Sequence, residues 1–162
     1  MLFWALIPIS TFADAVLVDG LYYNLSESSA EVTKMPEGKY SGDIVIPSSI
    51  TYNTEEYSVT SIGNEAFKEC NEVTSVVIPN TVVSIGDFAF DRCYAITSFN
   101  LPNSITSIGN WAFANTNITE IDIPTTVKSI GYSAFNSCRS LTSVTLPGGI
   151  SRIPIGLFED CN

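Results

Sequence analysis

The stretch VVSIGDFAFDRC, residues 82–93, decides the fold because four other stretches repeat its pattern. They are VTSIGNEAFKEC (59–70), ITSIGNWAFANT (105–116), VKSIGYSAFNSC (127–138) and ISRIPIGLFEDC (150–161). The isoleucines at 62, 85, 108, 130 and 153 lie 23, 23, 22 and 23 residues apart. Burying seven or eight apolar side chains contributes roughly 1.5–3 kcal/mol each, whereas ordering one unit costs about 1.5 kcal/mol per residue. No unit can therefore fold alone, and the repeats predict an elongated solenoid.

Each unit also carries apolar residues in the spacing L-x-x-L-x-L, which ends in the alternation of a short strand. A proline follows directly and ends the strand, because proline has no N–H to donate. The apolar sets are Val73/Val76/Ile78, Ile96/Phe99/Leu101, Ile118/Ile121/Ile123 and Leu141/Val144/Leu146. The later Gly-x-x-Ala-Phe segment combines a small residue with a core aromatic residue. We therefore expect short parallel strands joined by irregular or short helical turns on the convex side.

The unit LxxLxLPxxLxxIGxxAFxxC resembles the BspA-like class of bacterial leucine-rich repeats, and its period lies within the roughly 20–29 residues of such repeats. The resemblance covers residues 59–162, and residues 42–50 (GDIVIPSSI) resemble the first strand of that class. It implies a secreted or cell-surface protein with an extended binding surface, in some members for adhesion to host extracellular proteins. It implies no catalytic residues. The chain departs from the pattern at Thr116 (for Cys), at Pro154 (for Gly), and at four positions where other leucine-rich classes place Asn: Thr81, Ser104, Thr126 and Gly149.

The N-terminal 15 residues have the features of a signal peptide. The apolar run Leu2–Ser10 is too short to cross a bilayer, which needs about 20 residues, and it leads into Ala13-Asp14-Ala15, which resembles a cleavage site. Because no Lys or Arg precedes Ala15, we expect either that the start is truncated or that Met1 is not the native initiator. The alternative is a hydrophobic strand or helix that docks on the solenoid.

Residues 16–58 are expected to form a small antiparallel β cap and an atypical first repeat. Asp19-Gly20 lies between β-prone residues and predicts a hairpin, and residues 30–34 are a second strand candidate. Residues 50–59 are expected to form an inserted hairpin that turns near Asn53. Residues 59–162 contain the repeats, and the last unit is incomplete. This pattern predicts a fragment of a longer protein, with end-to-end self-association of the open end.

Composition favours a folded, non-enzymatic module without a cofactor. The 162 residues are 45% hydrophobic and carry 17 Asp and Glu against 7 Lys and Arg, for a net charge of −10. Without a basic cluster, neither nucleic acid nor an anionic membrane is an expected partner. The chain has no His, the commonest general base and metal ligand.

The four cysteines all stand three residues after the repeat phenylalanine, at Cys70, Cys93, Cys138 and Cys161. This regularity predicts a ladder of buried free thiols, since neighbouring units place their Cβ atoms too far apart for a disulfide. A Cys70–Cys93 or Cys138–Cys161 bridge and a metal site are the alternatives. A secreted chain could also be glycosylated at the sequons that begin at Asn24 and Asn117.

Two surfaces are candidates for binding. The variable strand positions are expected to point outward on the concave sheet as a polar strip with an acidic centre: Ser75, Val77, Ser98, Asn100, Glu120, Asp122, Ser143 and Thr145. An aromatic patch of Phe88, Trp111 and Tyr132 could hold a sugar ring or anchor a protein, or could simply pack on the next turn. The sequence thus predicts a secreted or surface-displayed protein that binds an extracellular or host-surface protein. The alternatives are a structural spacer of a longer chain and a carbohydrate-binding surface.

Overall fold

The fold is a β-solenoid, and the computed structural model describes residues 15–150 and 152–161 of it. The predicted signal peptide lies outside these residues except for Ala15. Twelve strands are described: β1 Val16–Val18, β2 Leu21–Ser26, β3 Ser29–Thr33, β4 Ser41–Val45, β5 Ser49–Tyr52, β6 Glu55–Ile62, β7 Glu72–Val77, β8 Ser84–Ile85, β9 Ser107–Ile108, β10 Glu120–Asp122, β11 Ser129–Ile130 and β12 Ser143–Thr145. Within the described ranges there is no helix, so the turns between strands are irregular and the short helical turns are not found.

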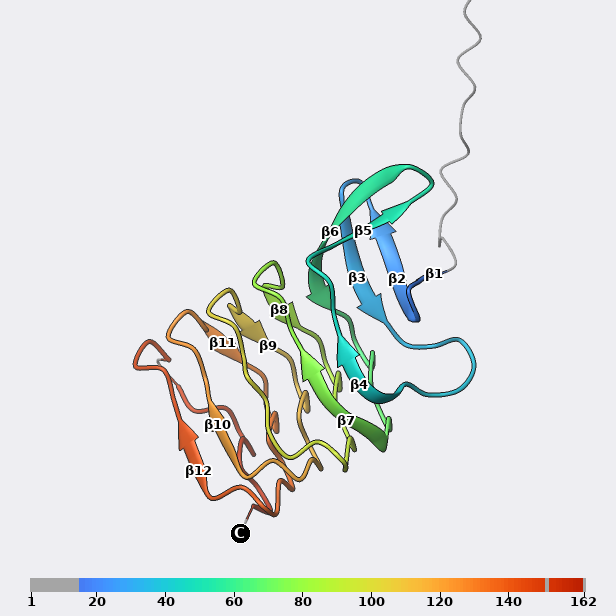
Figure 1. Ribbon diagram of the computed structural model, residues 1–162. Helices are drawn as coiled ribbons and strands as arrows, with labels where there is room; N and C mark the ends of the chain where they lie inside the picture. The colour runs from blue at the N-terminus through green and yellow to red at the C-terminus, as the bar shows by residue number, and fades with distance from the viewer. Residues whose placement is uncertain (1–14, 151, 162) are drawn as a thin grey trace, which may run out of the picture.

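One face of the solenoid is a ladder in which each strand pairs with the next over only two residues, and the sequence pattern did not predict it. The strands β6, β8, β9 and β11 run parallel, and Ile62, Ile85, Ile108 and Ile130 lie in register across them. Figure 1 shows these strands stacked side by side along the molecule. We call this arrangement the Ser-Ile ladder. Because each repeat places the same dipeptide opposite its neighbour, the backbone pairing follows the sequence period directly.

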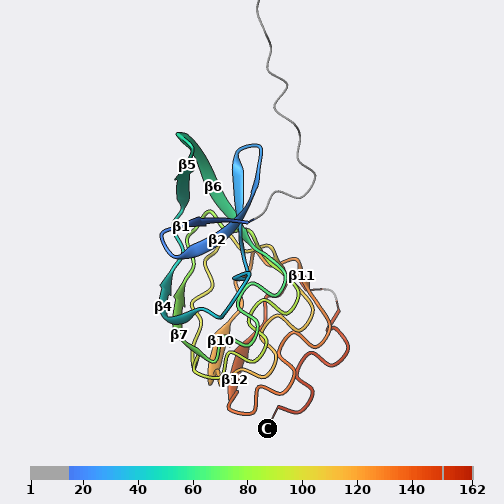
Figure 2. The ribbon, with the colours of Figure 1, turned by 90° about the vertical axis from the view of Figure 1, so that its right-hand side faces the viewer.

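The strands that precede the prolines lie on another side of the coil. Parallel pairing joins β4 to β7 and β10 to β12, and an isolated bridge joins Ser98 to Glu120. The strand expected near residues 96–101 is therefore reduced to this bridge. We call β4, β7, β10 and β12 the pre-proline strands. Figure 2 shows β4 and β7 on a different side of the coil from β11.

Two predicted hairpins are present before the regular repeats. β1 and β2 pair antiparallel around Asp19 and Gly20, whose φ angles of 47° and 85° suit a tight two-residue turn. β5 and β6 form the second hairpin, which turns at Asn53 and Thr54. β3 then pairs antiparallel with β2 and parallel with β6, so the first hairpin is continuous with the Ser-Ile ladder.

The core is a column of stacked phenylalanine rings. Phe67, Phe90, Phe113 and Phe135 are fully buried, and successive ring centroids lie 5.1, 5.4 and 5.4 Å apart. Tyr40 continues the column at the N-terminal end, 5.0 Å from Phe67. Each aromatic ring thus buries its faces against the neighbouring units, which is why a single unit cannot form this core alone.

Side chains also form ladders of hydrogen bonds between units. The Ser104 hydroxyl donates to the Val82 carbonyl at 2.6 Å, and the Thr126 hydroxyl donates to the Ile105 carbonyl at 2.8 Å. A second ladder follows the repeated spacing of the Ser-Ile-Gly motif, where Asn64 Oδ1 accepts from the Asp87 N–H and Asp87 Oδ1 accepts from the Asn110 N–H. These bonds satisfy backbone groups between units that the two-residue strands leave unpaired.

Candidate functional site

The eight predicted strip residues lie together on the outer face of the pre-proline strands and the adjoining segment at residues 98–100, and all eight are exposed. We call them the strand-face strip: Ser75, Val77, Ser98, Asn100, Glu120, Asp122, Ser143 and Thr145. Strand pairing aligns Glu120 with Ser143 and Asp122 with Thr145, while the bridge aligns Ser98 with Glu120. Their inward neighbours, such as Ile121, are buried in the core. The sequence predicts an alternation of outward, exposed residues with inward, buried residues, and the structure shows this alternation.

Two residues of β4 extend the strand-face strip and were missed by the sequence interpretation. Asp43 pairs with Ser75 and Val45 pairs with Val77. The Ser75 hydroxyl donates to Asp43 Oδ1 at 2.6 Å, and this bond together with one from Thr74 lowers the pKa of the Asp43 carboxyl. The alternation in GDIVIP was a usable signal for both residues. Val45 and Val77 are 68% and 56% exposed, so an apolar pair lies beside the polar positions.

A shallow hollow lies at the acidic centre of the strand-face strip. Its volume is about 330 Å³, and its polar lining comes from Ser98, Asn100, Asn103, Glu120, Asp122 and Thr125. The hollow lies where the pre-proline ladder is irregular, since only the bridge from Ser98 to Glu120 joins the two segments. Two carboxylates and two amides are thus presented beside a concave surface.

The aromatic patch is only partly assembled. The rings of Phe88 and Trp111 are stacked with centroids 6.2 Å apart and planes 9° apart. Tyr132 does not join this row, because it stands one position earlier in its unit than Phe88 and Trp111 do. Its backbone N–H donates to Asn110 Oδ1 at 3.0 Å and so continues the Asn64–Asp87–Asn110 ladder. The Lys68 ammonium lies 4.8 Å from the centre of the Phe88 ring. Phe88 therefore packs against Lys68 of the preceding unit and Trp111 of the following unit.

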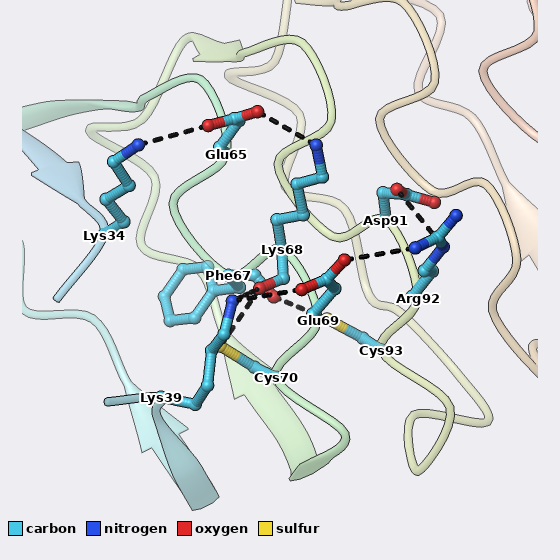
Figure 3. Close-up of polar contacts among 10 residues, drawn as sticks. All are labelled: Lys34, Lys39, Glu65, Phe67, Lys68, Glu69, Cys70, Asp91, Arg92 and Cys93. Carbon is cyan, nitrogen blue, oxygen red and sulfur yellow. Dashed lines mark hydrogen bonds and ion pairs between the residues drawn. The ribbon is translucent and has the colours of Figure 1, made fainter. Parts of the chain in front are cut away.

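Four of the seven basic side chains gather around the first two repeat turns, as Figure 3 shows. Glu65 pairs with Lys34 at 3.2 Å and with Lys68 at 2.9 Å, and these bonds lower the pKa of the Glu65 carboxyl. A second carboxylate forms pairs in the same way, because Glu69 lies 3.6 Å from Lys39 and 3.1 Å from Arg92. Lys39 also donates to the Lys68 carbonyl at 2.7 Å. This network ties the segment at residues 34–40 to the turns.

The cysteine ladder consists of free thiols. Cys93, Cys138 and Cys161 each donate to the carbonyl of the phenylalanine in the preceding unit, at 3.0, 3.2 and 3.1 Å. Burial raises the pKa of Cys93 to about 12 and that of Cys138 to about 11. Neither bridge, Cys70–Cys93 or Cys138–Cys161, is present. These thiols are packing groups whose S–H satisfies a buried carbonyl.

In the part of the chain that the structure describes, no group of three or more Cys, Asp and Glu side chains is placed to hold a metal ion. The same residues include no helix with the length and apolarity that crossing a membrane requires.

Comparison with solved structures finds the same solenoid in bacterial leucine-rich repeat proteins. A protein from Bacteroides ovatus is 34% identical with a TM-score of 0.68, over 90% of this chain and 45% of that protein. A protein from Bacteroides capillosus is 28% identical with a TM-score of 0.69, over 84% of this chain and 100% of that protein. The T. pallidum leucine-rich repeat protein is 24% identical with a TM-score of 0.72, over 91% of this chain and 78% of that protein.

The chain spans less than half the length of the Bacteroides ovatus protein. No curated protein matches it in sequence. The family model for the BspA type leucine-rich repeat region matches residues 60–162 in six copies. This match covers most of the chain and coincides with the units that form the Ser-Ile ladder and the phenylalanine column. The chain therefore belongs to the family of BspA-type leucine-rich repeat proteins.

Proposed function

We propose that this chain is a secreted or surface-displayed module that binds another protein through the strand-face strip. The observation that carries the proposal is the separation of roles along each pre-proline strand. Inward residues such as Val76 and Ile121 fill the core, whereas the outward residues beside them are exposed. Membership of the BspA-type family supports the location, because the family resemblance implies a secreted or cell-surface protein. A non-catalytic role agrees with the repeat architecture, since such solenoids present long surfaces.

The chemistry of the strand-face strip indicates the kind of partner. Glu120 and Asp122 place two carboxylates beside the hollow, and the Val45–Val77 pair adds apolar area at one end. A partner that places Lys or Arg side chains over the hollow and an apolar side chain over the valines would match both. Opposite charges across an interface mainly increase the association rate and the specificity.

We also propose that the first hairpin and Tyr40 act as the N-terminal cap of the solenoid. Tyr23 and Val32 are buried, and the Tyr40 ring covers Phe67. The Tyr40 hydroxyl donates to the Thr33 carbonyl at 2.7 Å and accepts from the Tyr22 N–H at 3.0 Å. These contacts tie the hairpin to the end of the phenylalanine column, and end repeats of solenoids need such cover.

The test of binding combines four alanine substitutions at Asn100, Glu120, Asp122 and Thr145. We expect association with immobilised host extracellular-matrix proteins, measured by surface plasmon resonance, to be lost in this variant. The melting temperature should stay nearly unchanged, because exposed substitutions usually change stability by less than about 0.5 kcal/mol each. A single Glu120→Gln substitution should weaken the salt dependence of association.

A matched control replaces four exposed residues away from the strand-face strip by alanine: Glu37, Thr51, Glu55 and Asn80. It removes the same two negative charges, so a loss of binding in both variants would indicate net charge rather than the strip. If the wild-type chain binds none of the matrix proteins, the result contradicts the binding hypothesis and supports the structural spacer.

A further inference from the structure

The turn of each unit contains a position with a left-handed backbone, and two large aromatic residues occupy it. Phe88 and Trp111 both have a φ of 56°. The same position holds Glu65, Ser133 and Gly156 in the other units, with φ between 55° and 67°. Bulky side chains rarely adopt this conformation, and such strain tends to be retained at functional sites. Because Ser133 and Gly156 occupy the equivalent position in the turns of their own units, the fold itself does not require an aromatic side chain there.

These two rings are half-buried and border a groove on the turn face. The groove has a volume of about 400 Å³, and its polar lining comes from Lys68, Glu69, Asp91, Arg92 and Asn115. We call it the turn-face groove. It is formed by the turns between units, whereas the strand-face strip lies on the pre-proline strands. The two surfaces share no residue, so they can be tested separately.

The polar groups of the turn-face groove are held in place by one another. Asn115 Nδ2 donates to Asp91 Oδ1 at 2.9 Å, and Asp91 is nearly buried. Arg92 Nη1 donates to Glu69 Oε1 at 3.1 Å, with its Nε 3.9 Å from Asp91 Oδ2. Figure 3 shows Glu69, Asp91 and Arg92 converging in this way. Planar donors and acceptors are therefore fixed beside an aromatic surface before any ligand arrives.

The charges in the turn-face groove balance, unlike those of the chain as a whole. Lys68 and Arg92 face Glu69 and Asp91, while the whole chain has a net charge of −10. An anionic ligand would meet the two carboxylates and a cationic ligand would meet the two bases. The lining thus favours an uncharged ligand that offers both hydrogen-bond donors and acceptors.

We propose that the turn-face groove binds pyranose rings of a neutral oligosaccharide. Trp111 supplies the apolar surface for the C–H face of a sugar, since Phe88 is already packed between Lys68 and Trp111. Small Ser133 follows Trp111 at the same position of the next unit. The sugar hydroxyl groups bond to Asp91, Arg92 and Asn115. This site goes beyond the proposed protein-binding strip.

Tryptophan fluorescence provides a direct test, because the chain contains only Trp4 and Trp111. In a Trp4→Phe background the emission comes from Trp111 alone. The probes are maltohexaose, cellohexaose, xylohexaose, mannohexaose and chitohexaose, each titrated up to about 10 mM. We expect at least one to change the emission saturably, with affinity at least about tenfold weaker in Arg92→Ala and Asn115→Ala. The Glu120→Ala/Asp122→Ala variant is the control and should bind as well as the parent.

Calorimetry of Trp111→Ser completes the test, since Ser133 shows that serine fits this turn position. We expect this variant to fold, judged by its circular dichroism melt, and to lose sugar binding. The proposal is wrong if no probe changes the emission or if Trp111→Ser binds like the parent. It is also wrong if only acidic saccharides such as polygalacturonate bind and high salt abolishes the binding. If Trp111→Ser does not fold, the Arg92 and Asn115 variants decide.

Discussion

At the scale of single residues, the repeat positions are fixed by contacts with the preceding unit. The cysteine position requires a small side chain that donates to a buried phenylalanine carbonyl. Thr116 differs from the cysteines, because its hydroxyl donates to the carbonyl of Phe113 in its own unit at 2.8 Å. The same hydroxyl lies 3.3 Å from Cys138 Sγ of the next unit. Threonine at this position therefore satisfies its hydroxyl on nearby backbone.

The thiols should react slowly in the native protein. The thiolate is the reactive form, and burial raises the pKa of Cys93 to about 12 and that of Cys138 to about 11. We expect titration with Ellman's reagent at mildly alkaline pH to modify half-buried Cys161 first and to reach four thiols only in denaturant. Equal rates for all four in native and denatured protein would contradict this burial.

The glycine of the Ser-Ile-Gly motif permits close approach between units. A Cβ added at Gly109 would lie 2.5 Å from the carbonyl carbon of Gly86, which is too close for real atoms. We expect Gly109→Ala to reduce the free energy of unfolding by about 1–3 kcal/mol, as overpacking does. Urea denaturation measures this change.

Gly148→Ala is the matched control, because nothing lies within 4 Å of a Cβ added there. Its unfolding midpoint should stay close to that of the wild type. Equal losses in the two variants would show that close packing at Gly109 does not explain the effect.

At the scale of elements, the turns are joined from unit to unit by regular backbone hydrogen bonds, as the strands are. The N–H groups of Phe88, Phe90 and Arg92 donate to the carbonyls of Asn110, Ala112 and Ala114 at 2.9, 2.7 and 3.0 Å. The left-handed backbone at Phe88 and Arg92 orients these donors toward the next unit. These turns are not helical, because their N–H groups donate to carbonyls of the next unit. In a helix the same groups would donate to carbonyls of their own unit.

The phenylalanine column should dominate the stability of the repeats. Truncating Phe113 to Ala removes a fully buried ring stacked on Phe90 and Phe135, and we expect a loss of about 3–5 kcal/mol. Phe158→Ala is the control, because this ring is half-buried and stacks on Phe135 alone among the repeat phenylalanines. The free energy of unfolding of Phe158→Ala, measured by urea denaturation, should fall by less than that of Phe113→Ala. A Phe158 effect as large as that of Phe113 would argue against the column as the main source of stability.

At the scale of the whole molecule, stability should decline in alkali. Burial raises the pKa of Cys93, Tyr23 and Tyr40 to about 12 and that of Cys138 to about 11, from ordinary values of 9.0 for the thiols and 10.0 for the phenols. Above about pH 9 the unfolded chain loses these protons before the folded chain does, so the free energy of unfolding falls as pH rises. The loss should continue to about pH 12.

Thermal melts between about pH 8 and about pH 11 measure this decline. In the Cys93→Thr/Cys138→Thr variant the first part of the decline, between about pH 9 and about pH 10, should be smaller, because threonine does not titrate. Thr116 already fills the same position, so the variant is expected to fold. A melting temperature that is constant across this range would contradict the prediction.

The sequence by itself determined the repeat, its period and the alternation of the strands before each proline. Val73, Val76 and Ile78 could be assigned to the core because an inward residue must be apolar in every unit that stacks on another. The same logic identified the cysteine ladder and the strand-face strip from residues 75 to 145. Both hairpins were also predictable, since Asp19-Gly20 and the turn near Asn53 are local signals.

Only the tertiary structure decided how the units pair. The pairings of the Ser-Ile ladder are two residues long, which is too short to show any periodicity in the sequence. The ladder exists because neighbouring units align the same dipeptide. The loss of a full strand at residues 96–101 likewise depends on contacts between units. The turn-face groove joins Lys68 to Trp111 across three units, so no single repeat encodes it. Local patterns specify what each unit is, whereas stacking specifies which side chains meet.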